Sequence, residues 1–61
     1  MQKLRSYNFS SGALVIFEKA RGWYGVRLYS SNGTLQDKIR TDDYRDALAY
    51  LRSFRAIAKN S

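Results

Sequence analysis

Aromatic and basic side chains alternate in one stretch of the chain, the segment GWYGVRLYSSNG at residues 22–33. If this stretch is a strand, Trp23, Arg27 and Tyr29 lie on one face, because successive strand residues point to opposite faces. An indole and a phenol can stack on nucleobases while a guanidinium contacts phosphates. The alternation therefore predicts a nucleic-acid interface on one face of a sheet.

Further basic residues complete this predicted interface. On the following segment Lys38 and Arg40 fall on the same face, and Arg21 lies in the turn before Trp23. If duplex DNA were the ligand, Arg27 is the residue expected to contact guanine in the major groove. The candidate nucleic-acid-binding residues are Arg21, Trp23, Arg27, Tyr29, Lys38 and Arg40. Single strand or duplex, and DNA or RNA, stay open at this point.

The same face also fits a protein interface. Aromatic residues and arginine are enriched where subunits meet, so Trp23 fits a homodimer contact as well as it fits a base stack. Lys38 and Arg40 also have an ordinary explanation as solvated charges on an outward face. A protein-interaction module or homodimer is therefore the alternative function.

The composition argues against catalysis. The chain has no cysteine and no histidine, which excludes disulfides, thiolate or imidazole metal ligands and the usual nucleophile–base pairs. Of its five acidic residues, Glu18 and Asp37 are expected to pair with Lys19 or Lys38 across the sheet, and the others fall at the start of a predicted helix. We expect no enzyme activity, no cofactor, no metal and no small-molecule substrate.

The charge balance favours a polyanionic partner. The chain has 11 basic and 5 acidic residues, a net charge of +6. Residues 1–41 contain seven of the basic residues and only two of the acidic ones, so the excess belongs to the predicted sheet. The longest apolar run, ALVIF, is far shorter than the ~20 residues of a membrane span. We expect a soluble, cytoplasmic protein without a signal peptide or a membrane partner.

Hydrophobic patterning predicts strands at about 13–19, 23–30 and 34–40, with a further edge strand at about 3–9. The predicted turns are SSG at residues 10–12, ARG at 20–22 and SNG at 31–33. Asn32-Gly33 is a strong hairpin signal, because both residues tolerate a positive φ. Leu35 and Ile39 are expected to face the helix, and Gln36 the opposite side. Either Val15 and Phe17 or Leu14 and Ile16 can face the helix, since both sets are apolar.

A helix is predicted at about 42–58. Apolar residues recur there at three- and four-residue spacing, at Tyr44, Ala47, Leu48, Leu51, Phe54 and Ala58. Thr41 or Asp42 is the expected N-cap, and acidic residues in the first turn suit the helix dipole. Residues 1–61 are therefore predicted to form one α+β domain. It has a three- or four-stranded antiparallel sheet followed by one C-terminal helix packed on one face.

The chain resembles the YegP-like small domains of unknown function. The resemblance covers residues 13–60 and rests on Phe17, Lys19 and Gly22, on the R-L-x-x-x-N-G pattern from Arg27 to Gly33, and on Tyr44. It implies a strand–strand–strand–helix fold and no activity. This chain is more basic and has one copy of a unit that is often tandem, which suggests pairing of two chains. A weaker likeness runs to Pur-type single-strand binders and ethylene-response-type DNA-binding domains, which bind through their sheets.

Overall fold

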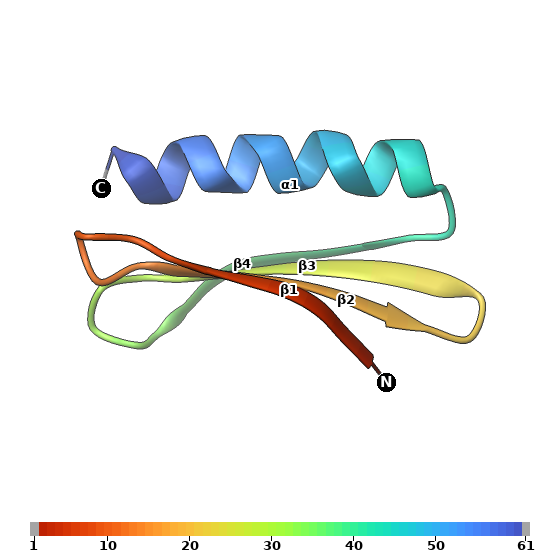
Figure 1. Ribbon diagram of the computed structural model, residues 1–61, viewed down its shortest axis with the longest axis horizontal. Helices are drawn as coiled ribbons and strands as arrows, with labels where there is room; N and C mark the ends of the chain where they lie inside the picture. The colour runs from red at the N-terminus through yellow and green to blue at the C-terminus, as the bar shows by residue number, and fades with distance from the viewer. Residues whose placement is uncertain (1, 61) are drawn as a thin grey trace.

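The computed structural model describes residues 2–60. Its elements follow in the order β1 (Gln2–Asn8), β2 (Leu14–Ala20), β3 (Trp23–Tyr29), β4 (Leu35–Thr41) and α1 (Tyr44–Lys59). The strands form one antiparallel sheet in chain order, and α1 lies across one face of it (Figure 1). This arrangement confirms the α+β prediction, including the edge strand.

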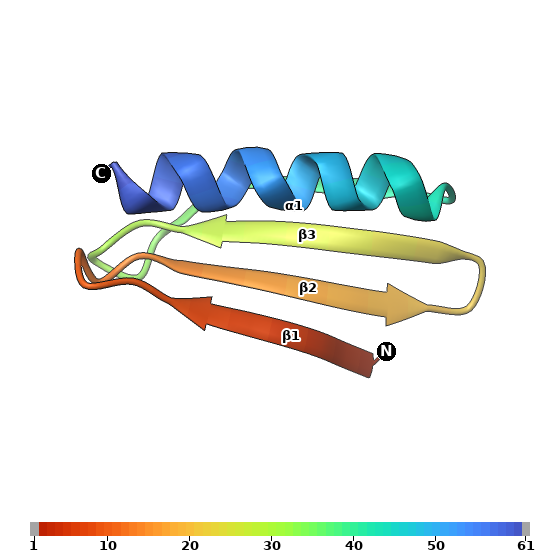
Figure 2. The same ribbon diagram turned by 45° about the horizontal axis from the view of Figure 1, so that its top comes forward.

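Each strand turns back beside its predecessor, so neighbours in sequence are neighbours in the sheet. Figure 2 shows this for β1, β2 and β3. The hairpin between β2 and β3 closes tightly, since Ala20 pairs with Trp23. The β1–β2 and β3–β4 loops lie together at the opposite end of the sheet. There, Ser11 Oγ donates a hydrogen bond to the carbonyl of Ala58, which ties the first loop to the end of α1 at 3.1 Å.

The strand register decides which apolar set of β2 faces the helix. Val15 pairs with Leu28 and Phe17 with Val26, and all four are buried beneath α1. Because residues paired across two strands share a face, Leu14, Ile16 and Glu18 lie on the other side. The alternative that sequence left open is thereby resolved in favour of Val15 and Phe17.

The helix completes this core with four buried residues at the predicted spacing, Ala47, Leu51, Phe54 and Ala58. The two alanines allow the helix to approach the sheet closely, while Leu51 and Phe54 fill the space above β2 and β3. Tyr44 and Leu48 belong to the same predicted stripe but are 50% and 36% exposed. They lie on the flank of α1, so the single helix leaves part of its own apolar surface uncovered.

Leu35 does not face the helix, contrary to the sequence prediction. Leu28 pairs with Asp37 but Tyr29 pairs with Leu35, so β4 has one extra residue at Gln36. This bulge reverses the side on which the residues before it point. Leu35 therefore lies beside Tyr29 on the face opposite the helix and is 45% exposed. A strict two-residue alternation cannot reveal such an insertion.

The predicted N-caps, Thr41 and Asp42, are also wrong. Thr41 is the last residue of β4, where it pairs with Tyr24. The strand therefore ends one residue later than expected and the helix begins two residues later, and Asp43 becomes the N-cap in an extended conformation. The Oδ1 atom of Asp43 accepts a hydrogen bond from the N–H of Arg45 at 2.8 Å. Thr41 instead accepts one from the N–H of Asp43 through its hydroxyl.

The two neighbouring loops have the same construction. In the β3–β4 loop, the carbonyl of Ser30 accepts a hydrogen bond from the N–H of Gly33, and the N–H of Ser30 donates one to the carbonyl of Thr34. In the β1–β2 loop, the carbonyl of Phe9 accepts from the N–H of Gly12, and the N–H of Phe9 donates to the carbonyl of Ala13. Gly12 and Gly33 have positive φ angles of 94° and 87°, whereas Asn32 does not. The SNG turn is therefore a three-residue loop with a positive φ only at its last residue, rather than the two-residue Asn-Gly turn.

The bulge yields a test with two leucines. Leu28→Ala should lower the free energy of unfolding by about 2–5 kcal/mol, because it leaves a cavity at a side chain that is 1% exposed. Leu35→Ala should change it by less than about 0.5 kcal/mol, as is usual for surface positions. Urea unfolding followed by circular dichroism measures both. Comparable losses in the two variants would contradict the register described here.

Candidate nucleic-acid interface

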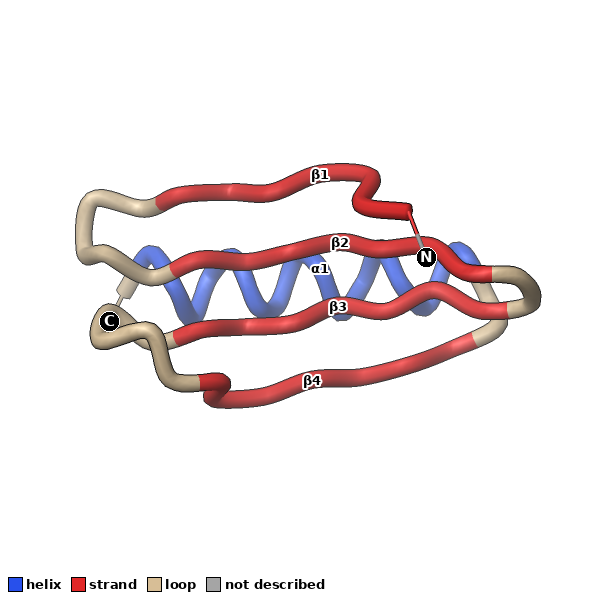
Figure 3. Tube along the Cα trace, turned by 90° about the horizontal axis from the view of Figure 1, so that it is seen from below, coloured by secondary structure: helices blue, strands red, loops and turns tan. Residues whose placement is uncertain are grey.

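The face of the sheet away from α1 is defined here as the open face. It comprises Lys3, Ser6 and Asn8 of β1, Leu14, Ile16, Glu18 and Ala20 of β2, Trp23, Gly25, Arg27 and Tyr29 of β3, and Leu35, Lys38 and Arg40 of β4. Viewed from this side, all four strands lie in front of the helix (Figure 3). No other element covers this face among residues 2–60.

The indole ring of Trp23 packs against the backbone of the sheet instead of extending into solvent. A Cβ atom built on Gly25 would come within 2.8 Å of Cζ3 of Trp23, so the indole occupies the space above the glycine. The guanidinium of Arg40, which is paired with Gly25, lies 4.2 Å from the centroid of the indole. Gly25 thus provides the space, Arg40 provides a cation–π contact, and Trp23 is half-buried.

A second cluster occupies the middle of the open face. Glu18, which is only 5% exposed, forms an ion pair with the Nη2 of Arg27. The Nη1 of Arg27 donates a hydrogen bond to the hydroxyl of Tyr29 at 2.9 Å. Its Nε is buried and has no partner within the described part of the chain. The guanidinium is therefore committed to internal contacts, and it orients both the carboxylate and the phenol.

The structure divides the predicted interface into two parts. Trp23 and Arg40 lie toward the β2–β3 hairpin, whose turn holds the exposed Arg21, while Lys38 is paired with Arg27 nearer the middle of the face. Tyr29 lies six residues along the strand from Trp23, or about 20 Å at the usual strand rise. All six predicted residues thus belong to the open face or its rim, but the two aromatic rings do not form one continuous platform.

Sequence reasoning missed the role of Glu18. It was expected to pair with Lys19 or Lys38, but its partner is Arg27 on the neighbouring strand. Lys19 instead lies on the other face, near the ring of Tyr24, and Asp37 accepts a hydrogen bond from the backbone of Lys38. Once Phe17 is placed in the core, Glu18 and Arg27 necessarily share the open face. The missing signal was therefore the orientation of β2.

The open face has little concavity. A hollow of about 120 Å³ lies between Trp23, Arg27 and Lys38, which is well below the ~300–1,000 Å³ of typical small-molecule sites. Among residues 2–60, no group of three or more His, Cys, Asp or Glu side chains is arranged to hold a metal ion. In the same range, no helix has the length and apolar character needed to span a membrane.

Comparison with known proteins gives no relative. No family model matches the chain, and neither a curated protein nor a solved structure matches it significantly. The observed order of strands and helix agrees with the topology that the resemblance to YegP-like domains implies. Membership of that family stays a prediction, because the agreement is one of topology alone.

The Trp23–Gly25 contact can be tested directly. Gly25→Ala should push the indole off the sheet, because the new methyl group would occupy the space of the ring. We expect acrylamide to quench the fluorescence of Trp23, the only tryptophan, more efficiently in this variant than in the unchanged protein. Circular dichroism should show that the fold is retained. Equal quenching of the two folded proteins would contradict the position described for the ring.

Proposed function

We propose that the protein is a non-enzymatic module that binds single-stranded nucleic acid through the open face. The observation that supports this most is the arrangement around Trp23, where an indole, Arg40 and the turn residue Arg21 share the half of the face near the β2–β3 hairpin, and Lys38 adjoins them at the middle of the sheet. The one carboxylate on the open face, among residues 2–60, is Glu18, and it is ion-paired and buried. That half of the face therefore attracts phosphates without a competing anion.

The proposed stacking of a base on Trp23 favours single strands over duplexes. A base that stacks on an indole must be unpaired and turned out of its own stack, which a single strand allows at little cost. A strand running along β3 would extend from Trp23 toward Tyr29. Over about 20 Å it would place several nucleotides above Arg27 and Lys38.

A base that stacks on Trp23 must compete with Arg40 for the ring. An exposed cation–π contact contributes about 0.5–1 kcal/mol, whereas a base–aromatic stack contributes about 1–3 kcal/mol. Replacement of the guanidinium by a base is therefore favourable, and Arg40 gains a phosphate contact when it moves aside. Arg27 holds Tyr29 in place, since its two Nη atoms already contact the Glu18 carboxylate and the Tyr29 hydroxyl.

The alternative of a homodimer or protein-interaction module rests on the other half of the open face. There Leu14, Ile16 and Leu35 form an apolar group around Tyr29, and Leu35 is 45% exposed. Burial of such side chains against a second copy would stabilise a dimer. Sedimentation of the free protein distinguishes this alternative, because a dimer has twice the mass of 7.1 kDa.

The fluorescence of Trp23 provides the first test of nucleic-acid binding. We expect saturable quenching on addition of a random single-stranded oligonucleotide at low salt, with weaker effects from a duplex. The affinity should fall steeply as salt is added, because binding releases counterions from the phosphates. A single-stranded RNA of the same length shows which nucleic acid is preferred.

Two arginine variants provide matched controls, since each removes one positive charge. In anisotropy titrations with a labelled oligonucleotide, Arg40→Ala should weaken binding by about fivefold or more. Arg45→Ala, on α1 in the opposite layer, should weaken it by less than about twofold. Equal losses would mean that only net charge matters, and an unquenched Trp23 at saturation would refute the stacking model.

A further inference from the structure

The helix layer is incomplete over β1. α1 packs on β2, β3 and β4, and mainly on β3. In Figure 1, β1 diverges from the helix toward the N-terminus. On the helix side of β1, α1 therefore contacts Tyr7 through Arg55 but leaves Leu4 38% exposed.

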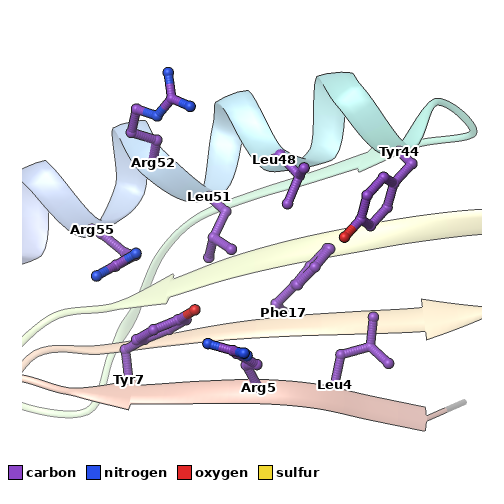
Figure 4. Close-up of a pocket in the computed structure, with 9 residues that line it drawn as sticks. All are labelled: Leu4, Arg5, Tyr7, Phe17, Tyr44, Leu48, Leu51, Arg52 and Arg55. Carbon is purple, nitrogen blue, oxygen red and sulfur yellow. The ribbon is translucent and has the colours of Figure 1, made fainter.

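A groove lies between β1 and α1, with a volume of about 530 Å³. Its apolar lining includes Leu4, Phe17, Leu48 and Leu51, and Tyr7 and Tyr44 lie at its two ends (Figure 4). Leu48 and Tyr44 are the flank of α1 that the sheet leaves exposed, at 36% and 50%. The groove therefore joins the uncovered parts of the strand and of the helix into one apolar surface.

The groove is basic as well as apolar. Arg5 and Arg55 extend into it from opposite walls, and Arg52 stands at its rim (Figure 4). The guanidinium of Arg55 lies 4.4 Å from the centroid of the Tyr7 ring, which holds it at the Tyr7 end of the groove. No carboxylate lines the groove among the residues that the structure describes. Two guanidinium groups at an apolar floor and a third that projects outward from the rim favour an amphipathic and anionic occupant.

The dimensions of the groove between β1 and α1 suit a helix. Packed helices lie 8–10 Å apart, and two strand spacings amount to about 9.6 Å. A second helix beside α1, which packs mainly on β3, would therefore lie over β1, where the groove is. It would cover Leu4 and Leu48 with its apolar side, and its polar flanks would lie beside Arg5 and Arg52.

We propose that this groove binds an acidic amphipathic helix of a partner protein. Its apolar residues at three- and four-residue spacing would fill the floor, and its Asp or Glu residues would pair with Arg5, Arg52 and Arg55. A second copy of the chain fits less well, because two basic surfaces would meet. Nucleic acid fits less well because the floor consists of leucine and phenylalanine side chains. The proposal is independent of nucleic-acid binding at the open face.

The test uses a designed peptide as the probe. It has 18 residues, with leucine at helical three- and four-residue spacing, glutamate on both flanks and a fluorescein label. Its control has the same composition in an order that destroys the apolar face. At near-physiological salt we expect saturable anisotropy with the first peptide, with a Kd below about 100 μM, and at least tenfold weaker binding of the control.

Two charge reversals assign the binding site. Arg5→Glu should weaken peptide binding at least tenfold, while single-stranded oligonucleotide binding changes less than threefold. Lys38→Glu, the same change of net charge on the open face, should leave peptide binding within threefold. Absence of peptide binding, equal effects of the two reversals, or equal binding of the control peptide would overturn the proposal. It would also be overturned if Arg5→Glu weakened oligonucleotide binding as much, or if it dissociated a dimer seen in sedimentation.

Discussion

The contact between α1 and one face of the sheet is the interaction on which the rest of the structure depends. Val15, Val26 and Leu28 are removed from water because Leu51 and Phe54 lie above them. A chain of 61 residues without cysteine has no disulfide to add stability, so this one apolar layer must supply most of it. Since one helix covers only one face, the side chains of the other face remain in contact with water and must be stabilised by contacts among themselves.

The open face achieves this through short-range contacts. Trp23 hides one side of its ring against Gly25, and Glu18 and Arg27 neutralise each other in the middle of the sheet. These contacts reduce apolar exposure and leave Lys3, Lys38 and Arg40 as the outward charges. On the helix side, the surface that stays uncovered is an apolar groove with arginines around it, because α1 is too narrow to cover four strands. The protein thus has two basic surfaces of different chemistry in opposite layers.

The alternation of Val26 and Leu28 and the helical spacing of Ala47, Leu51 and Phe54 were sufficient to predict the fold, because burial on one face dictates both periods. The same reasoning failed at Leu35, where an inserted residue in β4 reverses the pattern. For β2 it could not choose a face, because both sets of residues are apolar. The stack of Arg40 on Trp23 was not predictable either, because it depends on side-chain conformations and on strand register. The candidate residues themselves were identified by type and spacing, and their use as a binding site stays a prediction.

The bulge in β4 is matched by a register shift in β1, where Lys3 pairs with Glu18 but Arg5 pairs with Phe17, and the two irregularities have a consequence for association between molecules. They lie at the two edges of the sheet, near Leu4 in β1 and at Gln36 in β4. An edge strand has unpaired backbone groups that can template growth of a sheet into a fibril, and bulges and basic side chains oppose this. Here each edge has both, with Lys3 and Arg5 on one and Lys38 and Arg40 on the other. The positive charge therefore also protects a small, half-covered sheet from aggregation by edge-to-edge pairing.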